Sequence, residues 1–132
     1  MADYPSGYAI TKHLMSREEI VGIVVRSPND EANLNKGCSK KILDLLNLPK
    51  DSAFIWDRNN DLHERVDDIK KLKPDLILLA FCCGRILKSE LINIPPRGCI
   101  NIHLAYLPYN RGRNYGESRV SNIEYLEAEK NY

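Results

Sequence analysis

The chain has 132 residues, a formal net charge of +1, and 43% hydrophobic against 28% charged residues. This length allows one hydrophobic core, and the balanced charge offers no excess of positive charge for binding nucleic acid or a membrane surface. No run approaches the roughly 20 apolar residues of a membrane span, and the amino-terminal stretch lacks the apolar segment of a signal peptide. We therefore expect a cytoplasmic protein that does not bind membranes and, by this chain alone, does not bind nucleic acid.

Cysteine and histidine spacing gives no metal site. The four cysteines include an adjacent pair but no C-x-x-C, so we expect them to be reduced and mostly buried. His13 and His63 fall on predicted helices without a second ligand at a suitable spacing. They are expected to be surface or boundary residues and not zinc ligands.

The first half of the chain predicts two helices and two strands. A helix is expected over 7–18 with Ile10, Leu14 and Met15 on one face, followed by the strand EIVGIVVR over 19–26. The unbroken apolar run of this strand indicates burial on both sheet faces. A helix over 39–47 is expected to direct Ile42, Leu45 and Leu46 inward. A strand over 53–56 (AFIW) follows, and its Phe54 and Trp56 are expected in the core.

The second half repeats the pattern. In NDLHERVDDIKKLK, residues 60–73, apolar side chains recur three or four apart, with acids early and lysines late, as an amphipathic helix requires. The strand DLILLAFC (75–82), a helix over 86–94 and the strand CINIH (99–103) complete the series. Helices that alternate with strands imply an α/β fold, a Rossmann-like parallel sheet with helices on both faces. Ligands of such sheets bind outside the carboxyl ends of the strands, here residues 82–87 and 101–114.

Asn101 and His103 lie two residues apart at the carboxyl end of the last predicted strand. Side chains alternate along a strand, so both lie on one face and can approach one substrate atom. An amide can donate to a developing oxyanion and an imidazole can accept a proton, which together suit acyl transfer. The alternative is that both side chains only satisfy backbone groups at the strand end.

The longer segment KPDLILLAFCCGRILKSELINIPPRGCINIHLAYLPYNRGRN, residues 73–114, resembles the catalytic domain of the 10-formyltetrahydrofolate-dependent formyltransferases. This family includes methionyl-tRNA, glycinamide ribonucleotide and sugar N-formyltransferases. The resemblance implies that Asn101 holds the formyl oxygen and that His103 assists proton movement from the attacking amine. It also implies 10-formyltetrahydrofolate as formyl donor, with no metal.

The resemblance assigns two further groups of residues. The stretch Gly84, Arg85, Ile86 and Leu87 matches the segment that lines the pterin pocket. Leu107 and Pro108 match the turn into the substrate loop, and Arg111, Gly112, Arg113 and Asn114 match the loop itself. The R-G-R-N ending is more like the sugar branch, so the expected acceptor is a nucleotide-linked amino sugar. The alternatives are a methionyl-tRNA formyltransferase-like fragment and an inactive folate-binding or interaction remnant. Arg111 and Arg113 can also be read as solvated loop charges.

Two departures from the family pattern accompany this resemblance. Relatives open with a central strand of about six apolar residues, whereas only Met1 to Pro5 precede the first predicted helix, which suggests exposed sheet edges and possible oligomers. After residue 114 the chain lacks the family's G-x-D turn, whose aspartate completes the catalytic trio. We therefore expect a partial catalytic domain over 1–114, a divergent helical tail over 115–132, and doubtful activity for this chain alone.

Overall fold

The computed structural model describes residues 1–2, 4–29, 36–57, 60–80 and 86–102. Four short strands form the centre of the fold in this part of the chain. All described residues belong to one unit, Met1–Ile102; a second unit, His103–Tyr132, lies outside them. The predicted boundary at residue 114 and the predicted tail helix therefore lie outside the described residues as well.

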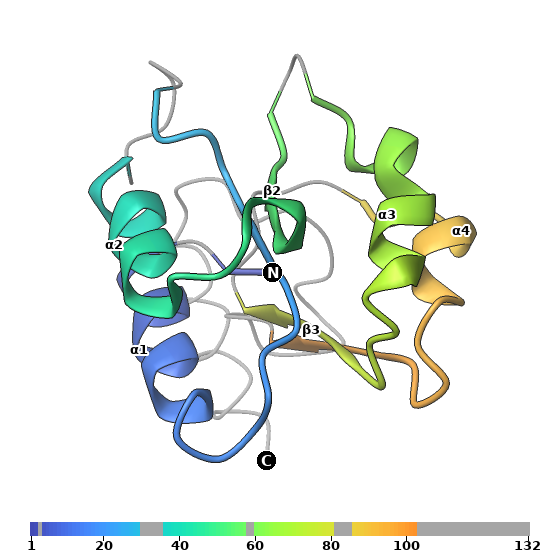
Figure 1. Cartoon of the computed structure of the whole chain (residues 1–132), viewed down its shortest axis with the longest axis horizontal. Coiled ribbons are helices and arrows are strands. Elements are labelled where there is room, and N and C mark those ends of the chain that lie inside the picture. Colours follow the sequence, from blue (N-terminus) through green and yellow to red (C-terminus); the bar gives the residue numbers. More distant parts are fainter. Residues whose placement is uncertain (3, 30–35, 58–59, 81–85, 103–132) are drawn as a thin grey trace, which may run out of the picture. The chain divides into compact units, whose positions relative to one another are not determined.

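Helices and strands alternate in the predicted order. The elements are α1 (Tyr4–Leu14), β1 (Ile23–Val25), α2 (Lys36–Leu46), η1 (Lys50–Ser52), β2 (Ala53–Ile55), η2 (Leu62–Arg65), α3 (Val66–Lys71), β3 (Ile77–Ala80), α4 (Ser89–Ile92) and β4 (Cys99–Ile102). The helix predicted after residue 60 is split, because its first turn is the 3-10 helix η2 and only α3 is α-helical. In Figure 1, α1 and α2 lie on one side of the strands, and α3 and α4 lie on the other. The α/β class predicted from the sequence is confirmed.

The strands form two parallel pairs that the chain's first two residues connect. β1 pairs with β2, and β3 pairs with β4. The backbone N–H of Ala2 donates to Val24 O at 2.9 Å, and Ala80 donates to Met1 O at 2.8 Å. The Met1 ammonium also donates to Leu78 O at 2.8 Å. Met1 and Ala2 thus occupy the central position between β1 and β3, where the sequence suggested a gap.

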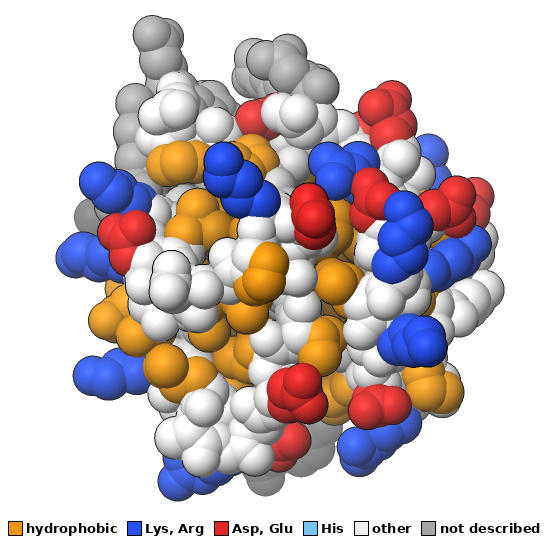
Figure 2. Space-filling view, in the orientation of Figure 1, with side chains coloured by type: hydrophobic (Ala, Val, Ile, Leu, Met, Phe, Trp, Pro, Cys, Tyr) orange, Lys and Arg blue, Asp and Glu red, His pale blue; other side chains and the backbone are white. Residues whose placement is uncertain are grey.

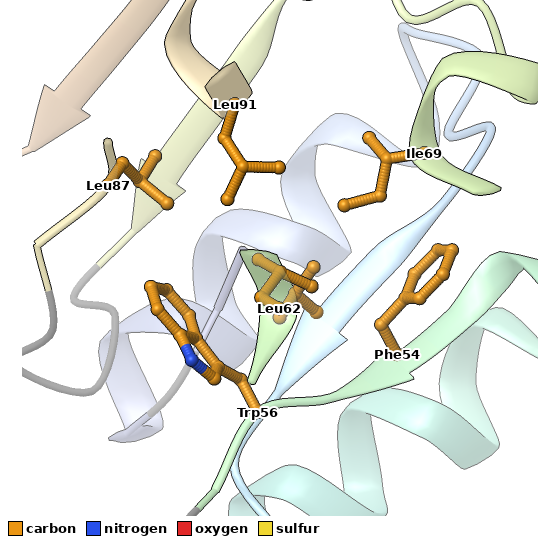
Figure 3. Close-up of a cluster of buried hydrophobic side chains, with 7 residues drawn as sticks. Phe54, Trp56, Leu62, Ile69, Leu87 and Leu91 are labelled. Atoms are coloured by element: carbon orange, nitrogen blue, oxygen red, sulfur yellow. The ribbon is translucent and has the colours of Figure 1, made fainter. Parts of the chain in front are cut away.

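Side chains of the two sheet faces form separate clusters. The first core cluster consists of Val24, Phe54, Trp56, Leu62, Ile69, Leu87 and Leu91 (Figure 3). The second core cluster consists of Ala2, Ile23, Val25, Ile42 and Ala80. Val24 belongs to one cluster and its two neighbours to the other, because successive side chains of a strand point to opposite faces. The predicted burial of this strand on both faces is confirmed, as is the core position of Phe54 and Trp56.

Two details of the first helix differ from the prediction. α1 starts three residues earlier than expected, since Pro5 has no N–H to lose and is tolerated in a first turn. The helix ends at Leu14, so Met15 leaves the predicted apolar face and is 43% exposed. The helix predicted to residue 18 is therefore four residues too long at its carboxyl end. Of the four cysteines that were expected to be mostly buried, Cys38 and Cys99 are partly buried, and Cys82 and Cys83 lie outside the described residues.

The turn before β4 depends on a glycine. Gly98 has φ +77°, a conformation that other residues adopt only with strain. Its N–H donates to Pro95 O at 3.0 Å, and its carbonyl accepts from Ile77 N at 3.2 Å. This turn therefore sets the register in which β4 begins beside β3.

Charged side chains border an apolar region on the face shown in Figure 2, where hydrophobic atoms occupy the centre and lysine, arginine, aspartate and glutamate lie around them. The helices described here include none that is both long and apolar enough to cross a membrane.

Candidate active site

Asn101 lies where the sequence placed it, near the carboxyl end of β4. It pairs with Leu79 of β3, and the next pair, Ala80 with Ile102, ends both strands at the same edge. Paired residues of parallel strands share a sheet face, so Asn101 lies on the face that carries the first core cluster, against which Leu79 packs. Asn101 is itself exposed. Its amide is therefore available to a ligand at this edge of the sheet.

The other predicted catalytic residue, His103, lies outside the described residues, and so does most of the predicted binding surface. This group comprises Gly84, Arg85, Leu107, Pro108, Arg111, Gly112, Arg113 and Asn114. Their predicted roles stay predictions.

Ile86 and Leu87 are the described end of the predicted pterin-binding stretch, and their surroundings differ sharply. Ile86 is 86% exposed, whereas Leu87 is 8% exposed and belongs to the first core cluster. Leu87 thus anchors the segment between β3 and α4 to the core, while Ile86 offers its apolar side chain to solvent. Of these two side chains, only Ile86 is free to contact a ligand in this structure.

A polar arrangement that the sequence reading missed lies next to this segment. The Nδ1 atom of His63 is 2.8 Å from Asp61 Oδ1, and its Nε2 accepts a hydrogen bond from the backbone N–H of Lys88 at 3.1 Å. Asp61 Oδ1 also accepts from the backbone N–H of His63 at 3.1 Å. These bonds to His63 hold the pKa of the Asp61 carboxyl below its usual range. The signal available in the sequence was D-x-H, which is too common to identify such a site.

Asp68 and Cys99 are two further ionisable groups near these elements whose pKa values are shifted. On α3, Asp68 contacts Lys71 Nζ at 2.8 Å and Arg65 Nε at 2.7 Å, which lowers the pKa of Asp68. Burial raises the pKa of the Cys99 thiol, whose Sγ donates to Ile92 O at 3.6 Å. A thiol held in its protonated form is a poor nucleophile. Cys99 therefore serves packing at the start of β4.

A pocket of about 360 Å³ lies at the end of β2, away from Asn101. Its lining comprises Ser27, Ala53, Phe54, Ile55, Asp57, Asn60, Asp61, Glu64 and Arg65. Asp57 Oδ1 accepts from the backbone and side-chain nitrogens of Asn60, at 2.9 and 2.8 Å, and so closes the turn. The guanidinium of Arg65 lies 5.3 Å from the centre of the Phe54 ring. Of the predicted site residues that the structure describes, Ile86, Leu87 and Asn101, none lines this pocket.

Metal ligation has no candidate among the described residues, because no three His, Cys, Asp or Glu side chains there come together as a group that could hold an ion. Among the described residues, the chemistry available at the carboxyl end of β4 is hydrogen bonding by the exposed amide of Asn101.

Comparison with known proteins identifies the family. The family model described as Formyl transferase matches residues 9–120. A methionyl-tRNA formyltransferase of Borreliella afzelii (strain PKo) is 30% identical over 86% of this chain and 35% of its own length. A methionyl-tRNA formyltransferase of Geobacter sulfurreducens is 51% identical over 37% of this chain and 15% of its own length. The aligned regions thus span about a third or less of these relatives. With a family match over most of its residues, the chain belongs to the formyl transferase family.

Proposed function

We propose that this chain supplies the formyl-donor site of a methionyl-tRNA formyltransferase-like protein, with 10-formyltetrahydrofolate as donor. The observation that carries the proposal is the exposed amide of Asn101, which lies beside the carboxyl end of β3. The exposed Ile86 follows β3 in the sequence. Carboxyl ends of parallel strands are the usual ligand edge of such sheets. The family match supports formyl transfer as the reaction class.

Formyl transfer assigns a distinct task to each proposed group. The amine nitrogen of the acceptor attacks the formyl carbon, and negative charge develops on the formyl oxygen. Asn101 donates an N–H to this oxygen. The hydrogen bond is strongest in the transition state, because negative charge has then developed on the oxygen. His103 assists the movement of the proton that the amine loses. The carbon–nitrogen bond to the folate then breaks, and the departing folate nitrogen takes the electron pair of that bond and this proton, so that tetrahydrofolate leaves. Ile86, with Gly84, Arg85 and the backbone of Leu87, contributes to the surface against the pterin ring.

The names of the relatives favour methionyl-tRNA as the acceptor. Each of the similar proteins reported above is a methionyl-tRNA formyltransferase. This favours the alternative considered from the sequence over a nucleotide-linked amino sugar, for which the R-G-R-N string of residues 111–114 is the supporting feature. The net charge of +1 is that of this chain alone. The alignment with the Borreliella afzelii relative covers most of this chain but only about a third of the relative. The net charge therefore says little about contacts with transfer RNA elsewhere.

Donor binding is the most direct test, because it needs only the part of the site that this chain is proposed to supply. The full chain is titrated calorimetrically with a stable analogue of 10-formyltetrahydrofolate, and again after Asn101→Ala and His103→Ala. We expect saturable binding to the wild type and weaker binding to both variants. A wild type that melts cooperatively but shows no saturation would contradict the proposal.

The acceptor is tested separately. Formyl transfer from 10-formyltetrahydrofolate is assayed with methionyl-tRNA and, in parallel, with a nucleotide-linked amino sugar. Mass spectrometry detects the formyl group added to each acceptor. We expect formylation of methionyl-tRNA in preference to the sugar. Preference for the sugar would restore the assignment that residues 111–114 suggest.

A further inference from the structure

His63 connects two segments that lie 25 residues apart in the sequence. Its ring packs edge-on against Trp56, with the ring centres 5.7 Å apart and the planes at 78°. Trp56 is 2% exposed and belongs to the first core cluster. The side chain of His63 is 14% exposed. The imidazole is therefore held against the core and is not a mobile surface group.

Hydrogen bonds fix which ring nitrogen carries the proton. Because Nε2 accepts from the backbone N–H of Lys88, it presents a lone pair there, and Nδ1 carries the hydrogen that it donates to Asp61 Oδ1. Asp61 thus holds the ring in the tautomer that can accept from Lys88. His63, through its hydrogen bonds, and the charge of Lys88, at the start of α4, both lower the pKa of the Asp61 carboxyl at the start of η2.

Lys88 is the point at which the segment after β3 becomes helix α4. Its carbonyl accepts from the N–H groups of Leu91 and Ile92, both at 3.1 Å, while its own N–H is bound by His63. The preceding residue, Leu87, is buried in the first core cluster. Ile86 therefore extends into solvent from a backbone that is fixed on its carboxyl side by one apolar contact and one hydrogen bond.

We infer that His63 is a positioning residue that, through the backbone of Lys88, holds Ile86 and Leu87 in the geometry required for donor binding. The inference rests on the proposed function, which places these two residues at the pterin surface. His63 does not touch the donor in this account. Its effect is to reduce the conformational freedom that donor binding would otherwise have to remove.

Two substitutions separate the two hydrogen bonds of the ring. Gln can place an acceptor near the position of Nε2, so His63→Gln keeps a partner for Lys88 N–H. Asn reaches only as far as Nδ1, so His63→Asn keeps a partner for Asp61 and loses the one for Lys88. Both variants remove the ring from Trp56, and the difference between them therefore isolates the Lys88 hydrogen bond.

The first readout needs no ligand. Hydrogen exchange of the Lys88 amide is measured by NMR on the full chain, together with a thermal melt of each variant. We expect exchange to be roughly three- to tenfold faster in His63→Asn than in His63→Gln, the factor that follows from losing one hydrogen bond. In the wild type, nitrogen–nitrogen scalar coupling between the Lys88 amide and the His63 ring should be detectable, which keeps the test independent of whether the variants fold.

The second readout is the dissociation constant of the stable donor analogue. We expect it to rise roughly three- to tenfold in His63→Asn and to stay within about twofold of the wild type in His63→Gln. A merely structural role would lower the melting temperature of both variants without separating their donor affinities. Equal affinities for the two variants, or absence of the coupling in the wild type, would overturn the inference.

Failure of the proposed function would give a different result. If the wild type binds no donor analogue, the proposed function is wrong and the positioning role for the donor falls with it. The exchange rate of the Lys88 amide would still decide whether His63 fixes this backbone. If that amide responds as expected while donor affinity is unchanged, the inference is overturned and the proposed function stands.

Discussion

Gly7 lies directly against the backbone of Ala80: a methyl group added at Gly7 would be 3.1 Å from the Ala80 carbonyl oxygen. It would also lie 3.3 Å from the carbonyl carbon of Ala2. α1 can therefore approach the central Met1–Ala2 segment and β3 only because this helical position has no side chain. The close approach matters because those two residues connect the two strand pairs.

Replacement of Gly7 by alanine is expected to destabilise the protein although alanine favours helix by about 1 kcal/mol. The added methyl group meets backbone atoms that hydrogen bonds hold in place, and overpacking of this kind costs about 1–3 kcal/mol. We expect a net loss of about 1 kcal/mol in the free energy of unfolding, measured by urea denaturation. Lys12→Ala, at an exposed position of α1, is the control and should change stability by less than about 0.5 kcal/mol. A higher urea midpoint for Gly7→Ala would contradict this packing.

Leu91 and Ile92 are adjacent on α4 but contribute differently to the core. Leu91 is 0% exposed and Ile92 is 40% exposed. Leu91→Ala should reduce the free energy of unfolding by about 2–5 kcal/mol, because it removes buried apolar surface and leaves a cavity in the first core cluster. Ile92→Ala is the matched control and should cost less than about 1 kcal/mol. Thermal and urea melts of both variants measure the difference; equal losses would mean that α4 does not pack as described.

The Asp61 carboxyl should make stability depend on pH at the acid end. Its pKa in the folded protein is below the ordinary value of 3.8, because His63 donates to it. Its stabilising contribution is therefore complete above the unfolded pKa and is lost as the pH falls through the folded pKa. Asp61→Asn keeps an acceptor for the His63 N–H but does not titrate.

Urea melts between pH 5 and pH 3, a range chosen to span the ordinary value of 3.8 for this carboxyl, would measure this dependence. The wild type should lose stability faster than Asp61→Asn as the pH falls. Asp68, whose pKa is also lowered, contributes to both proteins and cancels in the comparison. Parallel curves for the two proteins would show that ionisation of Asp61 contributes nothing to folding.

The order of elements could be predicted from the sequence because apolar periodicity is a local property. Ile42 lies on the predicted inward face of its helix and is buried. The ends of elements were less accurate: Met15 fits the helical period, yet the helix ends at Leu14 because packing and not periodicity sets the boundary.

Contacts between distant segments left no signal in the sequence. The hydrogen bond from Lys88 to His63 spans 25 residues, and a single histidine on an amphipathic helix does not reveal its partner. The central role of Met1 and Ala2 was missed for a related reason, since two residues show no periodicity and their position depends on backbone bonds to β1 and β3. Asn101 was found because its type and its place at a strand end carry chemical meaning.

Substitution of Asn101 should separate catalysis from folding. The side chain is exposed at the carboxyl end of β4, so Asn101→Ala should change the melting temperature little. Its proposed task is to donate a hydrogen bond to the formyl oxygen, and loss of one such donor typically lowers kcat about 10²- to 10³-fold. Asn101→Asp tests the same task at nearly constant shape, because an ionised carboxylate accepts hydrogen bonds and repels a developing oxyanion. We expect Asn101→Asp to be at least as impaired as Asn101→Ala in formyl transfer to methionyl-tRNA. Retention of wild-type kcat by Asn101→Asp would show that the amide does not stabilise the transition state, whatever its effect on donor binding.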